Sequence, residues 1–216
     1  AQDNACEGKG NHMTNPSPLS FSDNRSIPQL FRSITLQEWV TCAVIATALG
    51  VTYLFWTYLY EITKPFLKPL GLKYLTSGLW IITSVFLSNL IRKPGIALFA
   101  SVVAALMECV TTQWGWSAFI YGAIQGLGAE LVFALFLYRK WSLGVLALAA
   151  SVSAFCSYTY DYFAYDYANL SVGLNLLQVT SFIISAIVLA AFLSRYLSKR
   201  LLKTGLLDQF LIAKHG

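Results

Sequence analysis

Long uncharged stretches alternate with short polar and basic segments along most of the chain. Residues 39–60 contain no charged side chain, and five further apolar stretches follow. Crossing the hydrocarbon core of a membrane takes about 20 predominantly apolar residues. The pattern therefore predicts an all-α polytopic membrane protein with six transmembrane helices in one bundle. The expected helices cover residues 39–60, 74–91, 96–111, 117–138, 142–160 and 173–196.

Polar segments divide the chain into three expected parts. Residues 1–36 are rich in turn-forming residues and predict a flexible tail; Met13 would make a natural start, so residues 1–12 are treated as upstream or expression-derived sequence. Residues 37–197 form the transmembrane domain. Residues 198–216 are expected to form a basic amphipathic cytoplasmic tail along the membrane surface. The Lys64-Pro65 and Lys68-Pro69-Leu70-Gly71 segments are expected to break the chain after the first helix.

Composition agrees with a membrane protein and excludes several other classes. Of the 216 residues, 56% are hydrophobic and only 12% are charged, about half the charge of a soluble domain. The phosphate-binding G-x-x-x-x-G-K-[ST] motif and the hydrolase motifs G-x-S-x-G and H-E-x-x-H do not occur in the sequence. We therefore expect no enzyme, no ATPase and no nucleic-acid binding. The four cysteines and two histidines lack metal-ligand spacing, so no metal site is expected.

Basic residues mark alternate connections between the expected helices. Under the positive-inside rule, Lys and Arg gather on the cytoplasmic side. The segments that share one side of a six-helix chain contain Arg25, Arg32, Arg92, Lys93, Arg139, Lys140, Arg195, Lys199, Arg200 and Lys203. This places both termini in the cytoplasm. The connection with Lys64, Lys68 and Lys73 is the exception.

Polar and aromatic side chains from five expected helices fall at one depth, in the outer half of the membrane. They are Trp56, Trp80, Glu108, Tyr121, Gln125, Tyr158 and Asp161. A charge within a span costs about 2.5–3.5 kcal/mol on insertion scales and normally faces an interior or a water-filled cavity. Glu108 and Glu130 lie within spans, and no basic residue is expected at their depth. This arrangement predicts a cationic ligand, or else protonated carboxyl groups, and the nearby rings suit an aromatic cation.

Four of the candidates also have a simpler interpretation. Trp56 fits an interfacial aromatic belt as well as a binding site. Glu108 would also fit as a hydrated carboxylate near the outer interface, and Glu130 as a helix–helix hydrogen-bonding group. Asp161 would also fit as a solvated loop acid.

Two patterns of small residues predict close helix contacts. Cys42, Ala46 and Gly50 recur at every fourth position of the first expected helix, and Gly122 and Gly126 do so on the fourth. Such spacing lets two helices approach closely. Packing inside the bundle and docking of a separate membrane subunit on the first helix both agree with it.

Three runs of sequence resemble the YkoE family. They are Ile-Arg-Lys-Pro-Gly-Ile-Ala at 91–97, Ala-Ala-Leu-Met-Glu at 104–108, and Gly-Ala-Ile-Gln-Gly-Leu-Gly-Ala-Glu-Leu-Val-Phe at 122–133. The ending Lys-Thr-Gly-Leu-Leu-Asp at 203–208 is similar too, and the resemblance covers about residues 35–212. YkoE-like proteins are substrate-binding S components of energy-coupling factor (ECF) transporters, associated with thiamine or its hydroxymethylpyrimidine precursor.

The resemblance implies a multi-pass protein of the bacterial plasma membrane. It would capture thiamine outside and deliver it inward with a transmembrane coupling subunit and two ATPase subunits. It needs no cofactor, since thiamine is the bound substrate. Uptake of another vitamin or a neutral pyrimidine, or a non-transport role in membrane assembly, are the alternatives.

With this resemblance, our hypothesis gives a role to five of the eight candidates. Glu108 would neutralise or hydrogen-bond the ligand, Trp80 and Tyr121 would stack on it, Gln125 would bind the pyrimidine, and Glu130 would support the site from below. Small residues on the first helix would meet the coupling subunit, and here these are Cys42, Ala46 and Gly50. The chain departs from the family pattern at Cys42, and at Thr112-Gln113-Trp114-Gly115, where an Asn-Pro turn is expected.

Overall fold

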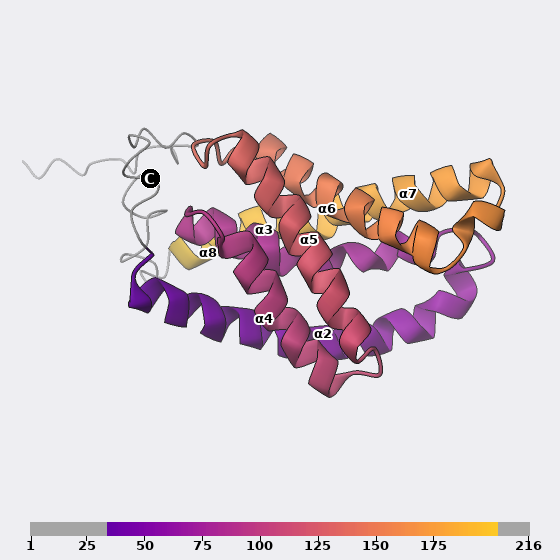
Figure 1. Cartoon of the computed structure of the whole chain (residues 1–216), viewed down its shortest axis with the longest axis horizontal. Coiled ribbons are helices and arrows are strands. Elements are labelled where there is room, and N and C mark those ends of the chain that lie inside the picture. The colour runs from indigo at the N-terminus through magenta and orange to yellow at the C-terminus, as the bar shows by residue number, and fades with distance from the viewer. Residues whose placement is uncertain (1–33, 203–216) are drawn as a thin grey trace, which may run out of the picture.

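Residues 34–202 are described by a computed structural model, in which helices follow one another with short connections (Figure 1). The elements are α2 (Leu36–Leu67), η1 (Lys73–Ile81), α3 (Ile82–Ile91), α4 (Ile96–Thr111), α5 (Trp116–Leu135), α6 (Leu143–Ala164), η2 (Tyr167–Asn169), α7 (Val172–Ala186), η3 (Ile187–Phe192) and α8 (Leu193–Leu202). Elements η1 and η2 are 3₁₀-helices and η3 is a π-helical stretch. The predicted tails, residues 1–33 and 203–216, lie outside the described residues.

Five helical segments in the described part are long and apolar enough to cross a membrane. They are Leu36–Leu67, Lys73–Ile91, Trp116–Leu135, Leu143–Ala164 and Val172–Leu201. Helix α4 is a sixth, shorter apolar helix of 16 residues, and its bounds are those predicted. The all-helical membrane architecture predicted from the sequence is therefore confirmed.

The predicted break at Lys64-Pro65 is wrong, because α2 continues through Pro65 to Leu67. Proline removes one backbone hydrogen bond, but the next turn still closes, since the Lys68 amide donates to the Lys64 carbonyl at 2.9 Å. The second predicted break, at 68–71, is confirmed: α2 ends at Leu67 and the chain turns at Gly71, whose φ of 72° lies in the left-handed region that glycine adopts readily. The C-terminal tail was predicted to begin at residue 198, which lies inside α8, since this helix runs to Leu202.

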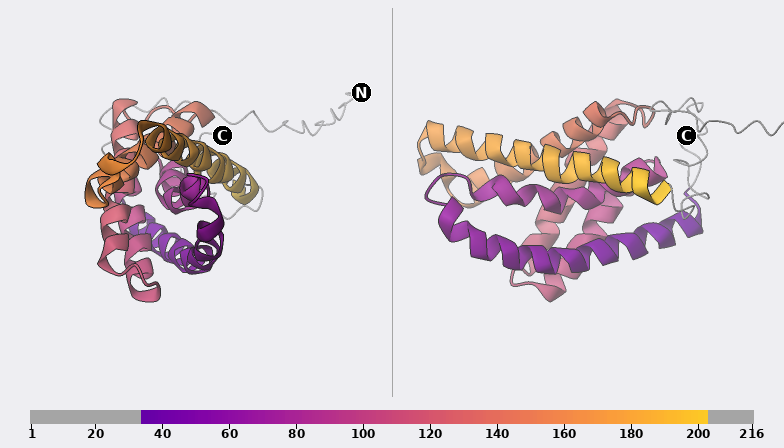
Figure 2. Two further views of the ribbon diagram at one scale, coloured as in Figure 1. Left: turned by 90° about the vertical axis from the view of Figure 1, so that its right-hand side faces the viewer. Right: turned by 180° about the vertical axis from the view of Figure 1, so that it is seen from behind.

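The η1–α3 segment is the central helix of the bundle (Figure 2). All ten residues of α3 are buried. On the η1 side, Gly78 touches the backbone of α7: a Cβ there would lie 2.3 Å from the Ser185 carbonyl carbon. The Gly78 amide also donates to Ser185 Oγ at 2.9 Å. This contact requires glycine and fixes η1 against α7.

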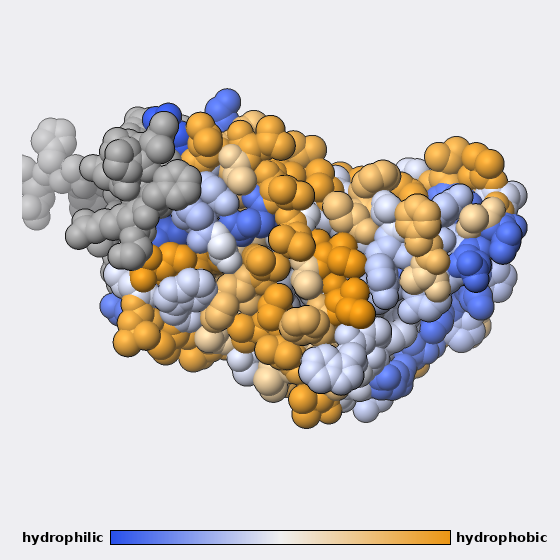
Figure 3. Space-filling model, in the orientation of Figure 1, coloured by the Kyte–Doolittle hydropathy of each residue, from blue (hydrophilic) through white to orange (hydrophobic). Residues whose placement is uncertain are grey.

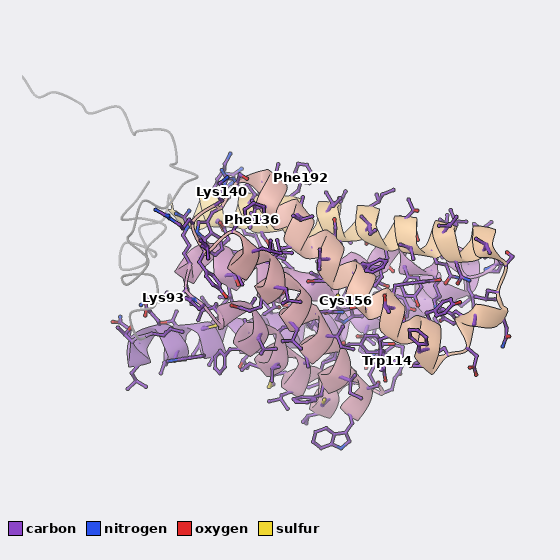
Figure 4. All side chains as sticks on the ribbon, turned by 45° about the horizontal axis from the view of Figure 1, so that its top comes forward. Lys93, Trp114, Phe136, Lys140, Cys156 and Phe192 are labelled. Atoms are coloured by element: carbon purple, nitrogen blue, oxygen red, sulfur yellow. The ribbon has the colours of Figure 1, made fainter. Side chains whose placement is uncertain are left out.

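The two ends of the bundle are polar, and an apolar band lies between them (Figure 3). We call the end that contains Lys93 and Lys140 the basic end; both are labelled in Figure 4. Lys93 forms a 2.6 Å ion pair with Glu38 there, which ties the start of α2 to the turn between α3 and α4. The opposite end is formed by the end of α2, the start of η1 and the connection between α6 and α7 (Figure 1).

Candidate functional site

A cavity of about 260 Å³ lies between η1 and helices α2, α4, α5 and α6. Binding sites for small molecules are typically cavities of this kind, mostly apolar with a few polar groups. Five of the eight predicted binding residues line it: Trp80, Glu108, Tyr121, Gln125 and Asp161. Trp56, Glu130 and Tyr158 do not.

Glu108 lies in the cavity wall near the end of α4 and is only 5% exposed. Its Oε1 accepts hydrogen bonds from Trp80 Nε1 at 2.6 Å and from Thr57 Oγ1 at 3.3 Å. Its Oε2 accepts none from residues 34–202, although buried carboxylates normally satisfy both oxygens. The second oxygen is therefore available to a ligand.

The 3₁₀ geometry of η1 turns three of its side chains into the cavity. Tyr74, Ser77 and Trp80 are spaced three residues apart and all line it. With three residues per turn, such positions lie on one face of a 3₁₀-helix. In an α-helix each step of three would fall about 60° short of a full turn, which would spread the same side chains around the helix. From the sequence, this segment was expected to be an α-helix, and Trp80 was its one predicted binding residue.

The floor of the cavity comes from α4 and α5, which are held close by Gly122. A Cβ at Gly122 would lie 2.3 Å from Ala105 Cβ. Gln125 follows one turn later and is 6% exposed, yet its side-chain amide has no hydrogen-bond partner in the described part of the chain. Since a buried amide normally pairs, Gln125 offers a donor and an acceptor to a ligand.

Asp161 joins the cavity from α6 and is buried among tyrosines. The hydroxyls of Tyr74 and Tyr121 donate to its two oxygens. Tyr167, from the connection between α6 and α7, accepts a hydrogen bond from Lys73 Nζ. Burial raises the pKa of Tyr167, so it stays a neutral phenol. Asp161 is thus a buried member of the cavity wall and not a solvated loop acid.

Two lysines also line the cavity, which corrects the expectation that no basic residue lies at this depth. Lys73 Nζ lies 4.5 Å from the ring centroids of both Tyr74 and Tyr167. Lys64 Nζ lies 5.4 Å from the Tyr60 ring and pairs with Glu61 at 3.3 Å. From the sequence, both lysines were expected in the connection between the first two helices. In the structure, Lys64 belongs to α2, which extends past Pro65, and Lys73 is the first residue of η1.

Glu130 lies away from the cavity, at the basic end. It accepts hydrogen bonds from the backbone amides of Gly95 at 2.6 Å and Ala97 at 3.0 Å, and from the Tyr138 hydroxyl at 2.6 Å. Burial raises the pKa of Tyr138, which keeps this hydroxyl a donor. A carboxylate at a helix N-terminus is favourable for the helix dipole. Glu130 therefore caps α4, which is close to the hydrogen-bonding alternative drawn from the sequence.

Trp56 and Tyr158 stand behind the cavity wall. Trp56 Nε1 donates to the Thr76 carbonyl at 2.8 Å, which holds α2 to η1. The Tyr158 hydroxyl donates to Asn175 Oδ1 at 2.7 Å, and its ring packs edge-on against Tyr74 with centroids 5.5 Å apart. Both side chains position other residues.

Several aromatic lining residues were not predicted. They are Tyr53, Tyr60, Tyr74, Trp114, Tyr165, Tyr167 and Phe182. The spacing of six between Tyr74 and Trp80, which is two turns of a 3₁₀-helix, was a usable signal for this geometry. The aromatic segment between α6 and α7 was noted but interpreted as a loop. Trp114, in the connection between α4 and α5, is labelled in Figure 4.

The small-residue stripe on α2 is buried inside the bundle. Cys42 and Ala46 are 0% exposed. A Cβ at Gly50 would lie 2.8 Å from both the Ala104 carbonyl oxygen and Met107 Cβ on α4. These residues have no surface left for another subunit, so the packing interpretation replaces the predicted coupling-subunit interface.

Comparisons with known proteins agree with the fold. A family profile described as "ABC-type cobalt transport system, permease component" matches residues 37–156. The chain is 35% identical over 184 residues to the HMP/thiamine permease protein YkoE of Bacillus subtilis (strain 168), covering 85% of this chain and 92% of the relative. A solved structure titled as an S-component of an ECF transporter superposes with a TM-score of 0.80 at 35% identity, covering 84% of this chain and 92% of that one.

Proposed function

The chain belongs to the YkoE family of ECF-transporter S components, and we propose that it captures thiamine, or its hydroxymethylpyrimidine precursor, in the cavity around Glu108. S components are substrate-binding membrane subunits and not enzymes, so the chain is a multi-pass protein of the bacterial plasma membrane. Such a subunit works with a transmembrane coupling subunit and ATPases. We propose two ATPase subunits for this transporter.

The pairing of Glu108 with aromatic rings is the observation on which this proposal rests. Trp80 binds one oxygen of Glu108, and Tyr60 packs on Trp80 with centroids 5.3 Å apart. Glu108 forms no ion pair within residues 34–202. A flat cation beside it gains Coulomb attraction to the carboxylate and cation–π attraction to the rings. The thiazolium ring of thiamine has both properties.

The aminopyrimidine ring fits the chemistry of Gln125. Its amino group is a hydrogen-bond donor and its ring nitrogens are acceptors, while Gln125 offers one group of each kind. Tyr121, one turn before Gln125 on α5, supplies an aromatic face to the cavity. In our proposal the pyrimidine therefore lies on the α5 side of the cavity and the thiazolium on the side of Glu108.

We propose six membrane spans, with the basic end in the cytoplasm. Support comes from the location of Lys93 and Lys140 at one end of the bundle (Figure 4), since cytoplasmic segments are enriched in Lys and Arg. The cavity would then open toward the outside. Import requires this direction.

A neutral pyrimidine is the second candidate ligand. Two acids, Glu108 and Asp161, and two lysines, Lys64 and Lys73, line the cavity, so its formal charge is balanced. A balanced site accepts neutral polar rings at less electrostatic cost than a site with two unpaired acids.

Isothermal titration calorimetry on the purified chain would test the proposal. We expect Glu108→Gln to weaken thiamine binding by about 10- to 100-fold, since a hydrogen bond to a charged group contributes about 1.5–3 kcal/mol. Binding of neutral hydroxymethylpyrimidine should change less than that of thiamine. Glu130→Gln is the matched control, because this carboxylate lies outside the cavity. If Glu108→Gln leaves thiamine affinity at the wild-type value, the site assignment is wrong.

A further inference from the structure

Lys73 is a partly buried cation of the cavity wall that lies beside two aromatic residues. Its ammonium lies 4.5 Å from the ring centroids of Tyr74 and Tyr167 and donates to the Tyr167 hydroxyl. The hydrogen bond places the ammonium at the hydroxyl edge of Tyr167, while the Tyr74 ring offers cation–π attraction. The protein's own cation occupies this part of the wall, so a bound cation must use other rings.

The same lysine serves Asp161. Tyr74 joins the two, because its hydroxyl donates to Asp161 Oδ2 and its ring lies under the Lys73 ammonium. Lys73 and Asp161 form no direct ion pair within residues 34–202, so the ammonium acts on the carboxylate through space, across Tyr74. A buried carboxylate without a cation is strongly unfavourable. Lys73 and the two tyrosine hydroxyls therefore compensate Asp161 within the protein.

The other two charged residues of the cavity, Lys64 and Glu108, differ in whether the protein supplies an opposite charge. Lys64 pairs with Glu61 at 3.3 Å. Glu108 is bound by Trp80 and Thr57, which are neutral donors. Among the acids that line the cavity in the described residues, Asp161 has an internal cation and Glu108 has none.

We propose that Lys73 sets the charge selectivity of the cavity: it neutralises Asp161 and leaves Glu108 as the one acid that a ligand neutralises. The site then prefers aromatic ligands with a single positive charge over neutral ligands of the same shape. This inference rests on the proposed function and names the residue that determines its ligand charge. The positive ring is directed to Trp80, because Lys73 lies beside Tyr74 and Tyr167 and Lys64 lies 5.4 Å from the Tyr60 ring centroid.

The test compares thiamine with deazathiamine, in which a thiophene replaces the thiazolium ring and removes the charge. Calorimetry on the purified full chain gives both dissociation constants, and their ratio reports charge selectivity independently of shape. In Lys73→Met, the affinity for thiamine relative to deazathiamine should rise about tenfold, because Asp161 then attracts the ligand cation. In Asp161→Asn, this relative affinity should fall by a similar factor. The double variant should return to the wild-type ratio.

Lys140→Met is the matched control, since this exposed lysine lies at the basic end, away from the cavity. Its ratio of thiamine to deazathiamine affinity should stay within about threefold of wild type. A lysine with a merely structural role would weaken both ligands equally in Lys73→Met and leave the ratio unchanged, which would overturn the inference. If Lys73→Met binds neither ligand, Asp161→Asn decides, and an unchanged ratio there is equally fatal. If the wild-type chain binds neither ligand, the proposed function itself is overturned. If the wild-type chain binds thiamine but the variants keep the wild-type affinity ratio, only the charge inference is overturned.

Discussion

Glu108, Asp161 and Glu130 are chemically alike, but their partners give them different tasks. Glu108 keeps one oxygen without a protein donor, whereas Asp161 receives two tyrosine hydroxyls. Glu130 binds the backbone amides at the start of α4. An acid in this bundle is thus a ligand group, a wall residue or a helix cap, depending on the donors that surround it.

The cap formed by Glu130 predicts a stability effect without a binding effect. Glu130→Gln removes the negative charge from the N-terminus of α4, and we expect it to lower the free energy of unfolding by about 1–3 kcal/mol. Thermal unfolding of the detergent-solubilised chain would measure this. Tyr138→Phe, which removes one donor to the same carboxylate, should give a smaller loss. Weakened thiamine binding with unchanged stability in Glu130→Gln would contradict the assignment.

For Gln125 we expect the reverse of the Glu130 result: a substitution should weaken ligand binding without lowering stability. Its buried amide has no partner in the described part of the chain, so Gln125→Leu should leave the melting temperature unchanged or raise it. Ligand affinity should fall about tenfold, because a ligand then loses its hydrogen-bond partner at a buried site. Measuring the melting temperature and the dissociation constant on the same preparation separates the two effects. A lowered melting temperature would show that Gln125 has a structural task.

Cavity residues could be predicted from the sequence where a polar or aromatic side chain lies deep within an apolar span. Glu108, Gln125 and Trp80 stand out because a polar or aromatic side chain within a span requires a reason. Lys64 and Lys73 gave no such signal, since lysines in a segment that contains proline and glycine are common in solvated loops. Their location follows from where α2 ends and η1 begins, which depends on tertiary packing.

Among the elements, η1 has the strongest influence on the cavity. A nine-residue 3₁₀-helix is unusually long, and contact with α7 at Gly78 holds it in place. We expect Gly78→Ala to destabilise the chain by about 1–3 kcal/mol, since its Cβ would overlap backbone atoms that cannot move aside. It should also weaken ligand binding, because Trp80 lies two residues later.

Gly144→Ala provides the matched control for this prediction. The nearest heavy atom to a Cβ at Gly144 lies 3.9 Å away, an ordinary contact. This substitution should be neutral or slightly stabilising, because alanine favours helix formation. Thermal unfolding and thiamine titration of both variants would check the pair. Equal melting temperatures would show that the contact at Gly78 is not tight.

Helix boundaries were predictable where turn residues and charge coincide. Helix α4 begins after Gly95 as predicted, because glycine follows a basic, proline-containing turn. The Lys64-Pro65 pair carried a similar signal, yet α2 continues, because a proline in the last turn costs only one hydrogen bond. Local sequence cannot distinguish these cases, since the energy of the additional turn depends on neighbouring helices.

For the whole molecule, the distribution of basic residues predicts the orientation. Asp166, in the connection between α6 and α7, and Lys140, at the basic end, are both exposed. In a background without native cysteines, a membrane-impermeant maleimide applied to intact cells should label Asp166→Cys and not Lys140→Cys. Lys140→Cys should react after the cells are permeabilised, which controls for its reactivity. The reverse labelling would place the cavity mouth in the cytoplasm and end the import proposal.

Helix α4, with 16 residues, rises about 24 Å, whereas the hydrocarbon core of a bilayer is about 30 Å thick. In the proposed six-span topology this is a hydrophobic mismatch, which membranes accommodate by local thinning. The hairpin tip between α4 and α5, where Trp116 is 77% exposed, would then draw the lipid headgroups inward. Glu108, one turn before the end of α4, would lie nearer to bulk water than its burial suggests, and a charged vitamin would cross less hydrocarbon to reach it.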